Sequence, residues 1–119
     1  MPNKVYEYND CSTCRKALKW LKQNEANFKL IPIRETPPNK VELRRMLKFY
    51  GGNIRKLFNT SGADYKKHNL KDNLPKLSEA QLIDMLNTNG NLIKRPFVIN
   101  KGGGRVGFKE EEWAEFFSL

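Results

Sequence analysis

The sequence predicts an α/β fold with a mixed four-stranded sheet, and three stretches of the chain carry that prediction. Residues 4–33 alternate strand, helix and strand, residues 36–92 show helical patterns with no clear strand, and residues 97–117 return to strand, strand and helix. The first stretch is short enough for a right-handed βαβ unit with parallel strands, whereas the later strand pair has the form of a hairpin. At 119 residues, of which 39% are hydrophobic, the chain is expected to form a single domain.

The N-terminal strand and helix are predicted from a change of pattern around residue 10. Residues 4–8 contain Val5 between two strand-favouring tyrosines, and Asn9 and Asp10 end the strand. From Ser12 to about Gln23 the apolar positions recur every three or four residues, which is the helical period. The two elements therefore meet at residues 9–11.

The second strand is expected over residues 27–33, and Pro32 gives it a place in the sheet. Proline lacks the N–H that a central strand must donate, so this strand should lie at an edge.

The segment 36–92 is interpreted as a helical insert packed beside the sheet. Asn39 with Glu42, and Ser78 with Gln81, have the spacing of capping boxes. They predict helices over 40–50 and 79–88, with a short helix over 54–58 that Asn53 caps and a helical turn over 65–69 between them.

The C-terminal part is predicted as a hairpin followed by a helix. Residues 97–99 form a short apolar run suited to a buried strand, residues 101–104 are a glycine-rich turn, and residues 105–108 form the returning strand. Three consecutive glutamates from Glu110 then occupy the first turn of a helix, where the macrodipole favours negative charge.

The two cysteines, Cys11 and Cys14, stand at the junction of the first strand and helix. A thiolate is stabilised at the N-terminus of a helix, and Arg15 and Lys16 add positive charge there. Cys11 is expected to be the exposed, attacking thiol, and Cys14 the buried, resolving one. A structural pair or half of a zinc site is the alternative, but zinc requires four ligands and only His68 remains as an obvious nitrogen donor. Redox or nucleophilic chemistry without a metal is therefore predicted.

The charge and the hydropathy pattern limit the partners. The net charge of +9 suits a nucleic acid, an acidic protein or an anionic substrate, but a solvated basic surface explains it more simply. No nucleic-acid-binding motif is visible, so direct DNA binding is not expected. No membrane-length apolar run and no signal peptide are visible either, so we expect a cytoplasmic protein without a membrane partner.

Four stretches of the chain together resemble the ArsC/Spx family, most of all its ArsC-like branch with a C-x-x-C motif. They are residues 11–15, 56–62, 92–96 and 106–113. This family has the thioredoxin-like fold and contains glutaredoxin-dependent arsenate reductases and the redox regulator Spx. The resemblance implies that Cys11 is the catalytic cysteine, that Arg95 lies near it, and that Pro96 is the cis-proline of the fold.

The candidate site follows from these residues. Cys11, Cys14 and Arg95 are assigned catalytic roles, with Cys11 and Cys14 as a redox-active disulfide. Binding roles are assigned to Ser12, Thr13, Arg15, Asn59 and Pro96.

One departure from the family bears on the reaction. Arsenate reductases of this family place three arginines around the cysteine, but this chain has Asn59 and Phe108, next to Lys109, at two of those positions. Cys14 offers an internal resolving thiol, as in Spx.

Three functions are therefore expected, in order. The first is an ArsC-like thiol–disulfide oxidoreductase, with no resident cofactor and with glutathione, thioredoxin or glutaredoxin as its electron donor. The second is a Spx-like redox-sensing regulator that binds the C-terminal domain of the RNA polymerase α-subunit. The third is a glutaredoxin-dependent arsenate reductase.

Overall fold

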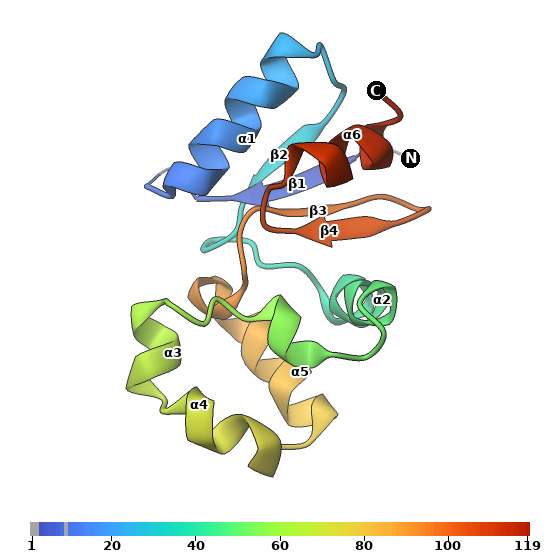
Figure 1. Cartoon of the computed structure of the whole chain (residues 1–119). Coiled ribbons are helices and arrows are strands. Elements are labelled where there is room, and N and C mark those ends of the chain that lie inside the picture. The colour runs from blue at the N-terminus through green and yellow to red at the C-terminus, as the bar shows by residue number, and fades with distance from the viewer. Residues whose placement is uncertain (1–2, 9) are drawn as a thin grey trace.

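The structure, a computed structural model, describes residues 3–8 and 10–119. It contains a four-stranded sheet in the order β2-β1-β3-β4 (Figure 1). Strands β1 and β2 are parallel, whereas β3 is antiparallel to both β1 and β4, so the predicted mixed sheet is confirmed. The strands are β1 Lys4–Glu7, β2 Lys29–Pro32, β3 Phe97–Ile99 and β4 Gly104–Val106.

The strands are shorter than predicted at several ends. β1 stops at Glu7, and Asn9, predicted to break it, lies outside the described residues. β2 occupies the sheet edge, as Pro32 requires. The returning strand predicted over 105–108 is present as β4, but it begins one residue earlier at Gly104 and ends at Val106, because Gly107 has a φ of +74°, a conformation that favours glycine and turns the chain.

Helices α1 (Ser12–Gln23) and α6 (Glu110–Phe117) cover one face of the sheet (Figure 1). The bounds of α1 and the acidic first turn of α6 agree with the predictions. Between these helices and the sheet lies a small apolar core centred on Trp113, which is fully buried and whose Nε1 donates a hydrogen bond to the Gly107 carbonyl at 3.0 Å. Val5, Ala17, Leu21 and Val98 complete this core.

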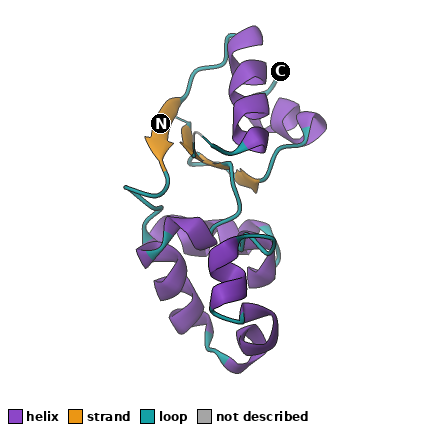
Figure 2. Ribbon diagram, turned by 90° about the vertical axis from the view of Figure 1, so that its left-hand side faces the viewer, coloured by secondary structure: helices purple, strands orange, loops and turns teal. Residues whose placement is uncertain are grey.

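The helices of residues 40–92 gather on the other face, away from α1 and α6 (Figure 2). The two predicted capping boxes are present at the starts of α2 (Lys40–Phe49) and α5 (Glu79–Thr88). The remaining helices are η1 Ile54–Leu57, α3 Ala63–Lys67, α4 Leu70–Asn73, η2 Leu74–Lys76 and η3 Gly90–Leu92.

Two predictions about the shorter helices need correction. The side chain of Asn53 makes no capping hydrogen bond to η1. The turn expected over 65–69 is α3, which begins two residues earlier at Ala63; Asn69, with a φ of 49°, then separates it from α4. Tyr65 and Leu70 anchor these short helices in the core. None of the described helices is long and apolar enough to cross a membrane.

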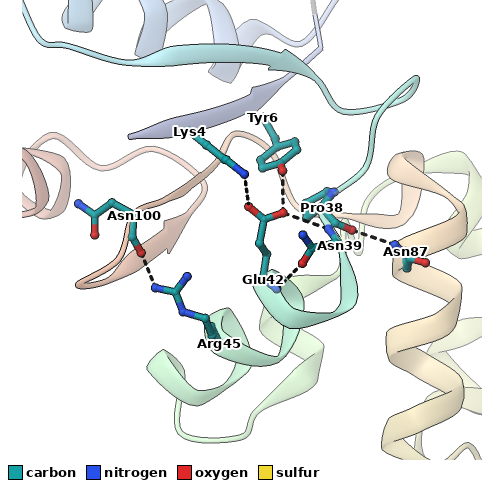
Figure 3. Close-up of polar contacts among 8 residues, drawn as sticks. All are labelled: Lys4, Tyr6, Pro38, Asn39, Glu42, Arg45, Asn87 and Asn100. Atoms are coloured by element: carbon teal, nitrogen blue, oxygen red, sulfur yellow. Dashed lines mark hydrogen bonds and ion pairs between the residues drawn. The ribbon is translucent and has the colours of Figure 1, made fainter. Parts of the chain in front are cut away.

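A buried carboxylate on α2 connects the helical segment to β1 (Figure 3). Glu42 accepts hydrogen bonds from the Tyr6 hydroxyl at 2.7 Å and from the Asn39 main-chain N–H at 3.1 Å, and Lys4 Nζ lies 3.2 Å from its other oxygen. Burial, followed by the hydrogen bond to Glu42, raises the pKa of Tyr6 well above its usual value. These contacts hold α2 in register with the strand that leads to Cys11.

Candidate active site

The two cysteines occupy different environments at the start of α1. Cys11 is the N-cap residue, and its Sγ accepts a hydrogen bond from the Cys14 N–H at 3.3 Å. Cys11 is partly exposed, whereas Cys14 is fully buried, and both are free thiols. The predicted difference in exposure is therefore confirmed, and the Cys14 N–H, which has no partner within the first turn of the helix, points at the Cys11 sulfur.

The environment of Cys14 opposes its ionisation. Burial, followed by a hydrogen bond with Cys11 and the negative charge on that sulfur, raises the pKa of Cys14 to about 12. A main-chain hydrogen bond with Tyr8 and the positive charge of Arg95 act in the opposite direction without offsetting the rise. Cys14 is thus protonated at neutral pH and must lose its proton when it attacks.

Arg95 reaches the site because residues 57–59 and 92–94 pair as a short antiparallel bridge. Asn59 N–H donates to the Leu92 carbonyl at 2.7 Å, and Lys94 N–H donates to the Leu57 carbonyl at 2.8 Å. The Arg95–Pro96 peptide bond that follows is cis, as the resemblance implies. The guanidinium of Arg95 lies 5.2 Å from the centre of the Tyr8 ring.

Cys11 opens into a cavity of about 340 Å³, which we call the thiol cavity. Its lining includes four of the candidate residues: Cys11, Thr13, Asn59 and Arg95. Pro96 is buried immediately before β3 and is not among the lining residues, and Cys14 is buried one turn along α1 from Cys11. Ser12 and Arg15 lie on the exposed side of α1 and are not among the lining residues.

The three positions that the resemblance aligns with arginines of the family's arsenate reductases meet around this cavity. Asn59, Arg95 and Phe108 all line it, with Lys109 beside Phe108. Asn59 and Phe108 are uncharged, so Arg95 is the guanidinium in the lining. The sequence reasoning missed Lys94 and Ser61, which also line the cavity although each lies inside a stretch that carries the resemblance.

A family model described as the ArsC family matches residues 6–116. This chain belongs to the ArsC family. The uncharacterized protein YusI of Bacillus subtilis strain 168 is 42% identical over 92% of this chain and 93% of its own length. The global transcriptional regulator Spx of Streptococcus agalactiae serotype V is 31% identical over 89% of this chain and 76% of its own length.

A solved structure, described as an ArsC family related protein from Bacteroides fragilis, superimposes on this chain of the ArsC family with a TM-score of 0.90. It is 40% identical, and the match covers 97% of each chain. The thioredoxin-like fold that the resemblance implies is therefore confirmed.

Proposed function

We propose that this chain is a thiol–disulfide oxidoreductase of the ArsC family in which Cys11 attacks and Cys14 resolves. The observation that carries the proposal is the difference between the two sulfurs. Cys11 is partly exposed at a cavity and receives a helix N–H, whereas Cys14 is enclosed one turn further along the same helix. An attacking thiol needs access, and a resolving thiol benefits from shielding until the intermediate forms.

The proposed reaction transfers two electrons from the cysteine pair to a disulfide. The Cys11 thiolate attacks one sulfur of the substrate R–S–S–R, which forms a Cys11–S–S–R bond and releases one thiolate. Cys14 then loses its proton and attacks Cys11, which releases the second thiolate and leaves a Cys11–Cys14 disulfide. The two thiolates take up the two protons of the cysteines, so one disulfide is reduced and one is formed.

A thiol donor must return the pair to the reduced form. We propose glutathione, thioredoxin or glutaredoxin for this step, since each supplies the two electrons through thiols. Arg95 supports the reaction by its position: its charge lowers the pKa of Cys14 and it faces the cavity through which a substrate reaches Cys11. Thr13 and Asn59, which also line that cavity, are proposed to contact the substrate.

Trapping the intermediate tests this proposal. The Cys14→Ser variant is expected to accumulate a mixed disulfide at Cys11 when it is mixed with oxidised glutathione, because the resolving thiol is gone. Mass spectrometry of the intact protein measures the added mass. Cys11→Ser is the matched control and should remain unmodified; equal labelling of the two variants would refute the assigned roles.

A Spx-like redox switch is the second candidate function, and the 31% identity to Spx over most of the chain favours it. In this proposal the same Cys11–Cys14 disulfide changes binding to the C-terminal domain of the RNA polymerase α-subunit. Binding of that domain to the oxidised and reduced protein, measured by calorimetry, separates the two functions. Equal or absent binding in both states would eliminate the switch.

Arsenate reduction is the third candidate, and the cavity gives it the least support. A tetrahedral oxyanion is held best by several guanidinium groups with forked donors, and two of the three expected positions are Asn59 and Phe108. We therefore expect little arsenate-dependent NADPH oxidation in an assay coupled to glutathione and glutaredoxin. Robust turnover would reverse this order of candidates.

A further inference from the structure

A second cavity of about 230 Å³ adjoins the thiol cavity and shares Asn59 and Arg95 with it. Its other polar lining residues are Tyr8, Arg34, Asp64 and Asn91, so we call it the Arg34–Asp64 cavity. The two cavities together are of the size that proteins use for small ligands. A ligand whose sulfur reaches Cys11 could therefore extend past Arg95 into the second cavity.

One wall of the Arg34–Asp64 cavity carries two guanidinium groups that Tyr8 positions. The guanidinium of Arg34 lies 4.7 Å from the centre of the Tyr8 ring, and that of Arg95 lies 5.2 Å from it. Arg34 Nη1 also donates a hydrogen bond to the Tyr8 hydroxyl at 2.8 Å. Neither guanidinium forms an ion pair with a carboxylate of residues 3–8 or 10–119. Their forked donors are suited to a carboxylate from a ligand.

The opposite charge comes from Asp64 on α3. Asn89 Nδ2 donates to Asp64 Oδ2 at 2.9 Å, and this hydrogen bond is the main reason that the pKa of Asp64 lies below its usual value. A contact with Asn91 and the nearby charges of Lys67 and His68 act in the same direction. Asp64 is therefore ionised at neutral pH and can accept hydrogen bonds from an ammonium group.

Two walls of this cavity lie close together because the backbone at Gly90 packs directly against the backbone at residues 33–34. A Cβ atom on Gly90 would overlap with the Ile33 carbonyl oxygen and lie 3.1 Å from the Arg34 Cα. Glycine at this position thus allows the loop that carries Asn89 and Asn91 to lie against the turn that carries Arg34. The backbone packing therefore fixes the segment that carries Arg34 relative to the loop whose Asn89 binds Asp64.

We propose that the Arg34–Asp64 cavity binds the α-amino-acid end of a small thiol or disulfide whose sulfur reacts at Cys11. Arg34 and Arg95 hold the carboxylate of that end, and Asp64 holds its ammonium group. The position of the ligand's sulfur at Cys11 rests on the proposed function, whereas the amino-acid end can bind in the cavity without any reaction at Cys11. The bonds made and broken at Cys11 and Cys14 are those already given for the disulfide exchange, with R as the group in the cavity.

Binding without chemistry is the first test, with S-methylglutathione as the probe because its blocked sulfur cannot react. Titration calorimetry on the full chain should show binding that Arg34→Gln and Asp64→Asn each weaken at least tenfold. Arg44→Gln, which removes an exposed arginine of α2, is the matched control and should bind like the wild type. No binding to the wild type, or equal binding by all four proteins, would overturn the proposal.

Substrate preference is the second test and separates this proposal from the proposed function. Arg34→Gln should slow the reaction of Cys11 with oxidised glutathione about tenfold and leave its reaction with bis(2-hydroxyethyl) disulfide, which has no amino-acid end, unchanged. An equal loss with both disulfides would overturn the recognition role. If neither disulfide reacts with the wild type, the oxidoreductase proposal fails, and the calorimetry alone decides whether the cavity binds an α-amino acid.

Discussion

The two ends of β1 differ in how fully the buried carboxylate at each end is hydrogen-bonded. At the N-terminal end, Glu42 is 6% exposed and receives the Tyr6 hydroxyl, Lys4 and a main-chain N–H. At the other end, Glu7 is 5% exposed and its Oε2 has no hydrogen-bond partner among the described residues. Cys11, Cys14, Arg34 and Arg95 all lie towards that second end.

This difference indicates that one end of β1 contributes mainly to stability and the other end to the reaction. A buried carboxylate with several donors fixes neighbouring elements, since losing any partner leaves a charge or donor unpaired. Groups that take part in reactions cannot be fully paired in this way, because they must be available to a substrate. We therefore expect substitutions at the Glu42 end to change stability, and substitutions at the Cys11 end to change rates and pH dependence.

The largest expected effect is on stability at Glu42. Glu42→Ala should lower the free energy of unfolding by about 3–5 kcal/mol, because it leaves Lys4, Tyr6 and the Asn39 N–H without their acceptor. Urea denaturation measures this loss. Lys40→Ala, on the same helix, removes the Lys40–Asp84 ion pair and is the control.

The two partners of that control pair have 46% and 60% of their side chains exposed, so its removal should cost at most about 1 kcal/mol. Similar losses in Glu42→Ala and Lys40→Ala would break the distinction between the two ends of β1.

The next effect concerns the pH dependence of the resolving step. Burial is the main cause that raises the pKa of Cys14 to about 12, and a Cys11 sulfur in a mixed disulfide is neutral, so it no longer opposes ionisation of Cys14 by its charge. The fraction of Cys14 thiolate, and with it the resolution rate, should rise about tenfold per pH unit while the pH stays below the pKa. Rapid acid quench of the Cys11–glutathione adduct, followed by mass spectrometry, measures this rate from pH 6 to 9. A flat profile would mean that Cys14 does not attack as a thiolate.

Much of the fold was predictable because its signals are local. The C-x-x-C at a strand–helix junction, the two capping boxes and the edge position of Pro32 each depend on residues close together in the sequence. The ends of β4 and α3 were not, because they depend on positive φ angles at Gly107 and Asn69. Short helices such as α3 and α4 form through tertiary packing more than through propensity.

The thiol cavity was also predictable in large part, whereas the Arg34–Asp64 cavity was not. Cys11, Asn59 and Arg95 were placed together by resemblance, and the thiol cavity contains all three. Arg34 and Asp64 gave no signal, because they are 30 residues apart in segments without a motif and line one cavity only in the folded chain. The sequence around Glu42 indicates a capping-box residue, but no pattern in neighbouring residues indicates that its carboxylate also contacts Lys4 and Tyr6 on β1.

A smaller effect is expected from Arg95 on Cys14. Burial dominates the raised pKa of Cys14, and the charge of Arg95 lowers it only in part. Arg95→Ala should therefore raise the pKa of Cys14 further and slow resolution at pH 7 by at most about tenfold, which corresponds to one pKa unit. Arg95→Lys keeps the charge and should resolve at nearly the wild-type rate. If the lysine variant is as slow as the alanine variant, the geometry of the guanidinium matters more than its charge.

The smallest expected effect is at Glu7, a buried carboxylate with one oxygen that has no hydrogen-bond partner among the described residues. Burial, followed by the charge of Glu35, raises the pKa of Glu7 above its usual value. A group whose pKa is raised by folding favours the native state below its unfolded pKa, and this contribution is lost as the pH rises through the folded pKa. Glu7→Gln cannot ionise, so its free energy of unfolding relative to the wild type should rise over that window and then level off. We expect a gain on the order of 1 kcal/mol or less at pH 7 and none near pH 3.5.

Urea denaturation of the wild type and Glu7→Gln across this pH range measures the difference, in which the contributions of the other carboxylates cancel. Glu35→Gln, at an exposed position, removes only the second cause and should give a smaller gain. A difference that does not change with pH would show that Glu7 is ionised at no cost, and the contrast with Glu42 would then lie in hydrogen bonding alone.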